Sequence, residues 1–272
     1  MKNIPFEKVR LGQSDLRVTP ICLGTMTFGE QVDEPTSHAV LSRSLERGVD
    51  FIDTAEMYSV PTRQETYSVT ESIIGRWFAA NPGVRQKLTL ATKVAGPSRG
   101  MPWVREGTGM AAADIVASCN ASLKRLQTDV IDLYQSHDDD AATPLEETMG
   151  AFADLITEGK VRAIGASNYT APRLLAALDT SARLGLPRYE SLQPLFNLID
   201  RAPYEDALES VCVEHGIGVI NFYGLAAGFL TGKYRSEADV TKSARGANTV
   251  KKYLNPRGLA VLGALDAVSA NI

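Results

Sequence analysis

Short apolar stretches alternate along the chain with longer segments in which apolar residues recur every three or four positions. Short runs rich in Val, Ile and Leu are typical of buried strands, whereas the longer pattern is typical of amphipathic helices. We expect strands to start near residues 21, 51, 88, 130, 161, 189 and 218. We expect helices over residues 36–48, 67–80, 112–127, 145–158, 170–184, 204–215 and 257–272. Strands and helices that alternate at this spacing predict βα units and a parallel sheet.

Turn and cap residues agree with these boundaries. Glycines stand where four of the helices should end, at Gly48, Gly159, Gly185 and Gly216, and glycine favours the left-handed conformation of that position. The segment Thr143-Pro144-Leu145-Glu146 predicts a helix start, with a capping hydroxyl, proline in the first turn and glutamate three residues after the cap. Ahead of the first unit, FEKVRLGQSDLRVT predicts a β-hairpin that turns near residues 12–15.

The number of units defines the expected fold class. Seven βα units are visible, and a (β/α)8 TIM barrel needs eight. An open sheet of seven strands would leave two unpaired edges. We therefore expect residues 1–272 to form one domain, an α/β TIM barrel with an N-terminal hairpin, whose strand eight and last helices belong to a missing C-terminal portion.

Composition and charge exclude several classes of protein. Apolar residues make up 44% and charged residues 22% of the 272 residues, which is enough to build a sizeable core. The net charge of −4 and the lack of a basic stripe argue against nucleic acid as a partner. No run approaches 18 apolar residues, and MKNIPFEKVRLG lacks a signal-peptide core, so we expect neither a membrane span nor secretion.

The three cysteines are widely spaced and odd in number, which fits reduced thiols and a cytoplasmic protein. No His or Cys cluster has the spacing of metal ligands, so we expect no metal site.

Four polar side chains follow the apolar part of three successive strands. They are Asp53, Tyr58, Lys93 and His137. In a parallel barrel these strand ends share one rim, so the four groups can meet in one cleft. A tyrosine with a pKa near ~10 is a weak acid, but a lysine ammonium nearby favours its ionised form. A carboxylate would hold that lysine, and a neutral histidine could orient a substrate oxygen.

This set contains no nucleophile–base pair, and no glycine-rich loop has the Rossmann or P-loop context. Protonation of a carbonyl oxygen during hydride transfer fits the four groups best, with a nicotinamide cofactor bound without a Rossmann unit. Structural interpretations remain open beside it. Asp53 could cap a turn, Lys93 could be a surface residue, and His137 could be structural. Residues 138–140, all aspartate, are typical of a solvated loop.

An ordered series of motifs runs through the chain: LGTMTFG at 23–29, GVDFIDTAEMY at 48–58, ATKV at 91–94, SLKRLQTDVIDLYQSH at 122–137, GKVRAIGASN at 159–168 and AAGFLTGKY at 226–234. This series resembles the aldo-keto reductase superfamily, and within it the bacterial branch related to potassium-channel β subunits. The resemblance implies a (β/α)8 barrel that binds NADP(H), with NAD possible, and reduces small-molecule aldehydes or ketones to alcohols.

The same resemblance assigns roles to residues. Tyr58 would be the general acid, Lys93 and Asp53 its tuning pair, and His137 the group that orients the substrate. Cofactor-binding positions would be Gly24, Thr25, Met26, Asp53, Ser167, Asn168, Gln193, Phe222, Tyr223, Gly224, Leu225, Ala226, Gly228, Leu230 and Lys233. Ser167 and Asn168 could instead be only part of a helix cap that includes Thr170.

Two departures from the family pattern bear on function. Relatives often carry an aromatic-Ser-Pro or Tyr-Tyr-Ser sequence where this chain has Phe222-Tyr223-Gly224, and Phe222 would stack on the nicotinamide. The family's segment that grips the adenosine 2′-phosphate has no counterpart here, so a preference for NADP follows from the resemblance alone. Two alternatives to a reductase therefore stay open: a cofactor-binding regulatory or redox-sensing subunit with little turnover, and an inactive truncated fragment.

Overall fold

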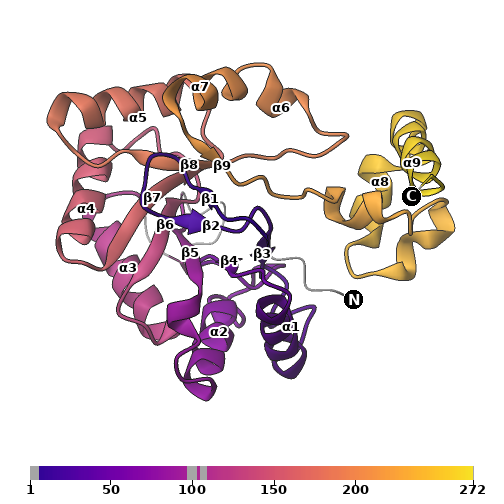
Figure 1. Cartoon of the computed structure of the whole chain (residues 1–272), viewed down its shortest axis with the longest axis horizontal. Coiled ribbons are helices and arrows are strands. Elements are labelled where there is room, and N and C mark those ends of the chain that lie inside the picture. Colours follow the sequence, from indigo (N-terminus) through magenta and orange to yellow (C-terminus); the bar gives the residue numbers. More distant parts are fainter. Residues whose placement is uncertain (1–5, 97–102, 105–108, 272) are drawn as a thin grey trace. The chain divides into compact units, whose positions relative to one another are not determined.

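A curled parallel β-sheet of seven strands forms the centre of the fold, and Figure 1 shows helices α1 to α5 around the outside of its strands. The computed structural model describes residues 6–96, 103–104 and 109–271. The strands are β3 (Cys22–Gly24), β4 (Phe51–Asp53), β5 (Thr89–Val94), β6 (Ile131–Ser136), β7 (Val161–Ser167), β8 (Tyr189–Gln193) and β9 (Gly218–Val219). They lie side by side in chain order, which confirms the predicted α/β class and the parallel arrangement of a TIM-type barrel.

The strand register brings equivalent positions of neighbouring strands together. Gly24 pairs with Asp53 between β3 and β4, and Lys93 pairs with Gln135 between β5 and β6. Because all seven strands run in one direction, their carboxyl ends share one side of the sheet. The predicted hairpin is also present, with β1 (Val9–Arg10) antiparallel to β2 (Arg17–Val18).

Helices follow the strands, and the first five of them have nearly the predicted bounds. The helices are α1 (Glu34–Glu46), α2 (Val69–Ala80), α3 (Ala112–Leu126), α4 (Leu145–Thr157), α5 (Ala171–Leu184), α6 (Ala202–Glu205) and α7 (Leu208–His215). A short 3-10 helix, η1 (Arg85–Lys87), precedes β5. The four glycines expected at helix ends all have positive φ, between 60° and 81°. They end their helices because an L side chain would be strained in that conformation.

Two local predictions were wrong. Residues 204–215 do not form one helix but two short ones, α6 and α7. The predicted cap of α4 is also displaced: Pro144 occupies the N-cap position, and the Thr143 hydroxyl donates to the carboxylate of Asp140 at 2.6 Å. An acidic acceptor three residues earlier therefore binds the hydroxyl that the sequence pattern assigned to the helix end.

A continuous apolar core fixes the first helices on the sheet. Its buried members, from α1, α2, the end of α3, strands β4 and β5 and the adjoining loops, are Phe28, Leu41, Ile52, Ile73, Ile74, Trp77, Phe78, Val84, Leu88, Leu90 and Leu126. Complete burial of one such side chain contributes about 1.5–3 kcal/mol. This packing holds β4 and β5, and with them the candidate residues at their ends, in fixed positions.

The contacts divide the chain into two compact units. The first unit comprises the described residues up to Leu192 together with Cys212–Val219, and the second comprises Gln193–Val211 and the described residues from Ile220 onward. That residues 1–272 act as one domain stays a prediction. Beyond β9 the described residues form η2 (Ala226–Thr231), η3 (Glu237–Lys242), α8 (Gly246–Tyr253) and α9 (Pro256–Ser269), with no eighth strand of the parallel sheet among them.

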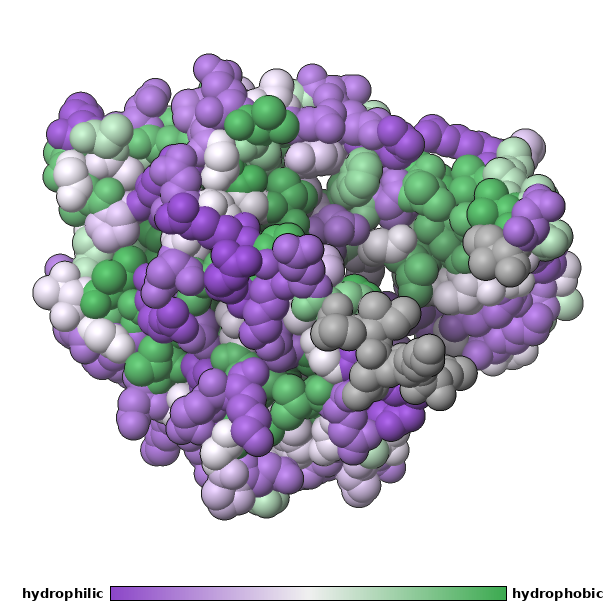
Figure 2. All heavy atoms as spheres, viewed as in Figure 1, coloured by the Kyte–Doolittle hydropathy of each residue, from purple (hydrophilic) through white to green (hydrophobic). Residues whose placement is uncertain are grey.

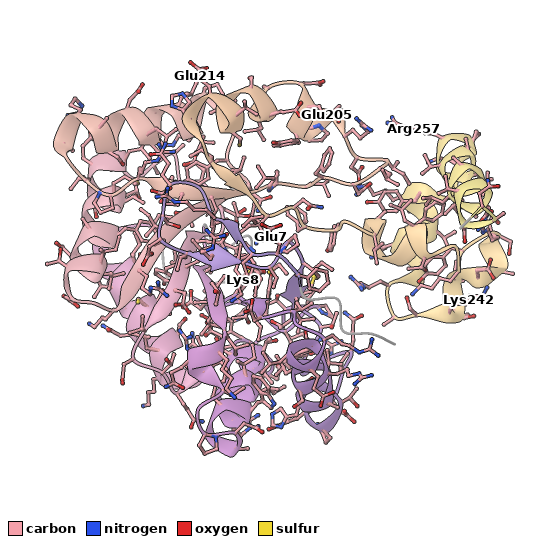
Figure 3. The ribbon with its side chains drawn as sticks, viewed as in Figure 1. Glu7, Lys8, Glu205, Glu214, Lys242 and Arg257 are labelled. Atoms are coloured by element: carbon pink, nitrogen blue, oxygen red, sulfur yellow. The ribbon has the colours of Figure 1, made fainter. Side chains whose placement is uncertain are left out.

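The second unit has a core of its own. Its buried members are Ile199, Ala226, Phe229, Leu230, Tyr234, Val250, Tyr253 and Leu262. Arg257, labelled in Figure 3, ties α9 to the rest of this unit by donating to the carbonyl of Ile199 at 2.9 Å. Leu225, Leu259 and Val268 are exposed, and Figure 2 shows hydrophobic residues (green) among hydrophilic ones (purple) on this unit.

Two searches of the described residues, for a membrane-spanning helix and for a group of metal ligands, found neither. None of the helices between residues 6 and 271 that the structure describes is long and apolar enough to cross a membrane. Within the same described ranges, His, Cys, Asp and Glu side chains form no group of three or more that could hold a metal ion.

Candidate functional site

The four residues predicted to carry chemistry lie at the carboxyl ends of three neighbouring strands. Asp53 is the last residue of β4, Lys93 is the last but one of β5, and His137 directly follows β6. Tyr58 lies in the loop that leaves β4, where its backbone N–H donates to the carbonyl of Ala55 at 3.1 Å. The arrangement brings together groups that are up to 84 residues apart in sequence.

Lys93 is the centre of this cluster and is fully buried. Its Nζ donates to Oδ2 of Asp53 at 2.6 Å, to the carbonyl of Thr54 at 2.8 Å and to the hydroxyl oxygen of Tyr58 at 3.4 Å. It also lies 5.0 Å from the centre of the Tyr58 ring. The ammonium therefore bridges the carboxylate and the phenol, and the interpretation of Lys93 as a surface residue is wrong.

Opposing effects act on the charge of Lys93. Burial lowers the pKa of its ammonium, but the negative charge of Asp53 and the phenol of Tyr58 raise it by more, so the pKa lies above its ordinary value. Lysine at this position is consequently charged over the whole neutral range. A fixed positive charge 3.4 Å from the Tyr58 oxygen stabilises negative charge that develops there when the phenol releases its proton.

His137 joins the cluster through Tyr58 on one side and Asn168 on the other. The rings of His137 and Tyr58 meet edge to face, with centroids 5.7 Å apart and planes at 82°. The amide of Asn168 donates to the His137 carbonyl at 2.9 Å and to Oγ of Ser167 at 3.1 Å. The end of β7, where two cofactor-binding residues were predicted, thus adjoins the predicted catalytic residues.

Asn168 has a left-handed backbone conformation at the turn between β7 and α5. Its φ of 57° is left-handed, a conformation uncommon for residues other than glycine. The N-cap of α5 is Thr170, whose side chain accepts from the N–H of Arg173. Helix capping therefore explains Thr170 but not Ser167 or Asn168.

The predicted loop after β3 is fixed to the same cluster by hydrogen bonds. Thr25 donates to the Asp53 carbonyl twice, from its N–H at 3.0 Å and from its hydroxyl at 2.9 Å. The Met26 carbonyl accepts from the N–H of Val60, two residues after Tyr58, at 2.8 Å. Gly24 is exposed beside them, with open space where a Cβ would stand. All predicted site residues of the first unit therefore form one connected group.

The other predicted cofactor-binding residues belong to the second unit. They are Gln193, Phe222, Tyr223, Gly224, Leu225, Ala226, Gly228, Leu230 and Lys233. Tyr223, Ala226 and Gly228 have positive φ, so this segment folds as a tight irregular loop. The Ala226 and Leu230 side chains are buried in the core of the unit, whereas Leu225 is exposed. A Cβ on Gly228 would lie 3.2 Å from Nζ of Lys233, so this cation lies directly over the glycine.

The acidic segment after His137 is not a solvated loop, contrary to the interpretation of its sequence. Asp138 and Asp140 are buried, and Asp140 accepts from the N–H of Ala142 and from the hydroxyl of Thr143. Asp139 forms an ion pair with Arg173 of α5 at 2.7 Å. These carboxylates fold the loop on itself.

Two residues of the cluster were missed by the sequence analysis. Gln135 is fully buried on β6, and its Nε2 donates to Oδ1 of Asp53 at 3.1 Å. Glu56 is also buried, and its carboxylate accepts from the N–H of Ala95 at 3.0 Å, which ties the Tyr58 loop to the end of β5. A polar side chain two residues before His137, in an otherwise apolar strand face, was the signal for Gln135.

The amino-acid sequence is similar to those of known proteins. The model of the aldo/keto reductase family matches residues 20–271. The chain is 38% identical over 259 residues to Protein tas of Escherichia coli (strain K12), covering 89% of this chain and 73% of that protein. It is 36% identical over 249 residues to the uncharacterized oxidoreductase YrpG of Bacillus subtilis (strain 168), covering 91% and 75%. It is also 31% identical over 248 residues to a probable voltage-gated potassium channel subunit beta of Arabidopsis thaliana, covering 90% and 72%.

Proposed function

The chain belongs to the aldo/keto reductase family, and we propose that it is an NAD(P)H-dependent reductase that converts aldehydes or ketones of small molecules to alcohols. Membership of this family, and relatives that are named as an oxidoreductase and as an aldo-keto reductase, support the assignment of the chain as an oxidoreductase. The observation that carries the finer proposal is the position of the Lys93 ammonium, 2.6 Å from the Asp53 carboxylate and 3.4 Å from the Tyr58 hydroxyl.

Tyr58 acts as the general acid in this proposal. When bound, a reduced nicotinamide supplies the hydride that the carbonyl carbon receives. Tyr58 donates its proton to the carbonyl oxygen as negative charge develops there, and Lys93 stabilises the phenolate that remains. Asp53 keeps the buried ammonium charged and in place. His137, whose ring packs edge to face with that of Tyr58, orients the substrate oxygen.

The residues of the first unit fit a nicotinamide. Ser167 and Asn168 present a hydroxyl and an amide at the end of β7, next to His137, and such groups can bind the carboxamide. Gly24, Thr25 and Met26 would lie beneath the cofactor. For the second unit the resemblance to the family assigns a carboxamide contact to Gln193 and a stacking ring to Phe222, and it assigns pyrophosphate contacts to Leu225, Ala226, Gly228, Leu230 and Lys233; these assignments are part of the proposal. The choice of NADP over NAD is part of the proposal and follows from the family.

Replacement of Tyr58 by phenylalanine tests the acid role. Tyr58→Phe should lower turnover by about 10²- to 10⁴-fold, the range of general acid catalysis. Its affinities for NADPH and NADH, measured by titration of the protein fluorescence, should stay near those of the wild type. Tyr67→Phe is the matched control, because Tyr67 lies in the same loop but no hydrogen bond links it to Lys93 among the described contacts. Turnover that is equal in Tyr58→Phe and wild type would remove the acid from the proposal.

A second candidate is a regulatory or redox-sensing subunit that binds the cofactor and turns over slowly. The similarity to a probable voltage-gated potassium channel subunit beta favours it. Steady-state oxidation of NADPH with a panel of simple aldehydes and ketones separates the two, since only a reductase sustains many turnovers. The three free cysteines agree with a cytoplasmic site of action, which we include in the proposal.

A further inference from the structure

We propose that Gln135 is a positioning residue that fixes the Asp53 carboxylate, so that the Lys93 ammonium faces Tyr58; this inference rests on the proposed function. The two oxygens of Asp53 are bound by different partners. Oδ2 accepts from Nζ of Lys93 at 2.6 Å, and Oδ1 accepts from Nε2 of Gln135 at 3.1 Å. A carboxylate bound at both oxygens has a defined plane.

The strand register allows this contact. Strand β5 lies between β4 and β6; Asp53 pairs with Ala91, two residues before Lys93, and Lys93 pairs directly with Gln135. On β6 the ring of Tyr134 packs against Phe152 of α4 on the helix side of the sheet. Successive side chains of a strand point to opposite faces, so Gln135 points to the interior, and its amide reaches Asp53 across β5.

Space for Gln135 is provided by the next strand. Gln135 pairs with Gly165 on β7, and a Cβ built on Gly165 would lie 3.2 Å from Cγ of Gln135 and 2.2 Å from Oγ of Ser191. Any larger residue at Gly165 would displace one of these side chains. The absence of a side chain at Gly165 therefore leaves room for the Gln135 side chain in the interior.

Stability alone does not favour glutamine here. The interior of such barrels is usually filled by Val, Ile and Leu, whereas Gln135 is fully buried and its Oε1 accepts no hydrogen bond from the described part of the chain. Burial of an incompletely bonded amide is unfavourable. The donor that it supplies to Asp53 is neutral, so it orients the carboxylate without competing with the charge of Lys93.

Gln135→Met and Gln135→Glu test the proposal. The methionine is unbranched and apolar and removes only the donor. We expect kcat to fall about 10- to 100-fold at every pH, the cost of a slightly misplaced catalytic group, while the KM for the cofactor and for the carbonyl compound stay within about twofold. A residue needed only for packing would not reduce kcat selectively.

The glutamate variant gives a signature in pH. Two carboxyl groups about 3 Å apart cannot both ionise readily, so the introduced group keeps a proton at low pH and donates to Asp53 as the amide does. We expect Gln135→Glu to approach wild-type kcat at acidic pH and to lose it as the pH rises. Gln86→Glu on the exposed η1 is the matched control, because it adds the same charge at the amino end of β5.

The unfolding of the protein without cofactor provides a readout that does not depend on turnover. Gln135→Glu should lose more stability than Gln86→Glu as the pH rises from 5 to 8, because only its added carboxyl faces Asp53. Identical pH profiles of the two variants, or wild-type kcat in Gln135→Met, would overturn the positioning role. If the wild-type protein oxidises neither NADPH nor NADH with any carbonyl compound, the proposed function is wrong. The pH dependence of unfolding of Gln135→Glu and Gln86→Glu would still show whether residue 135 interacts with Asp53.

Discussion

The buried ion pair between Glu71 of α2 and Arg125 of α3 allows a quantitative prediction. Nε of Arg125 lies 2.7 Å from the carboxylate of Glu71, whose side chain has no exposed surface, while the Arg125 side chain is 20% exposed. The other Glu71 oxygen accepts from the hydroxyl of Thr92, the residue before Lys93, at 2.6 Å. The pair therefore supports the strand that carries the candidate catalytic lysine.

Replacement of Arg125 by methionine leaves the Glu71 carboxylate buried without its cation. Removal of one partner of a buried pair typically costs about 3–5 kcal/mol. Since Thr92 continues to donate to Glu71, and water can reach the site vacated by a partly exposed side chain, we expect the lower end of this range, about 3 kcal/mol at pH 8. Glu71→Gln in the same chain removes the uncompensated charge and should recover most of the loss.

The loss must also depend on pH. Burial raises the pKa of Glu71 above its ordinary value, although Arg125 and Thr92 lower it. In the folded state the carboxyl thus holds its proton more tightly than in the unfolded state, and stability falls as the pH rises from the unfolded pKa through the folded one. Without Arg125 the folded pKa rises further. The decrease in the free energy of unfolding caused by Arg125→Met should therefore be small near pH 5 and grow toward pH 8.

Urea unfolding monitored by the fluorescence of Trp77 measures this effect, since Trp77 is buried on the same helix as Glu71. Arg183→Met is the matched control: its ion pair with Glu146 has a similar distance, 2.6 Å, but both side chains are more than half exposed. Exposed pairs contribute little, so this variant should unfold like the wild type. An Arg125→Met penalty that is no larger than that of the control, or that is equal at pH 5 and pH 8, would refute the reasoning.

Two further variants test the interior of the sheet. Asp53→Asn removes the main charge that raises the pKa of Lys93, so that burial lowers it; the ammonium should be lost as the pH rises through this lower value, and kcat should decline at a lower pH than in wild type. An alkaline limb that coincides with that of the wild type would contradict this. Gly165→Ala places a Cβ 2.2 Å from Oγ of Ser191 and should cost about 1–3 kcal/mol in urea unfolding. Ser191→Ala should recover part of that cost, and strictly additive effects of the two changes would argue against the clash.

Much of the fold could be predicted because its signals are local. Apolar runs identified the strands of the sheet, helical periodicity identified the helices that follow them, and glycines marked the helix ends. The errors arose where a nearby side chain competed with the local pattern. Thr143 has the sequence of a helix cap, but the carboxylate of Asp140 accepts its hydrogen. Residues 138–140 have the composition of a solvated loop, but Arg173 and the loop's own backbone bind them.

The part of the candidate site that lies at the ends of adjacent strands could be predicted from the sequence. Asp53, Lys93 and His137 each end an apolar run, and adjacent parallel strands bring such ends together. Gln135 could not be assigned from its motif, because only the register shows that its amide crosses β5 to reach Asp53. The second unit carries the remaining predicted positions, and their role in cofactor binding stays a prediction.

The chain order of the strands has a consequence for how the protein is made. Each strand of the sheet after β3 pairs with the strand that was synthesised just before it. During translation, the partner of every new strand has therefore already left the ribosome. The carboxylate and the ammonium can meet once β5 has emerged, and the amide that braces them arrives one unit later. The residues that bind Lys93, together with Gln135, are thus all synthesised before α8 and α9.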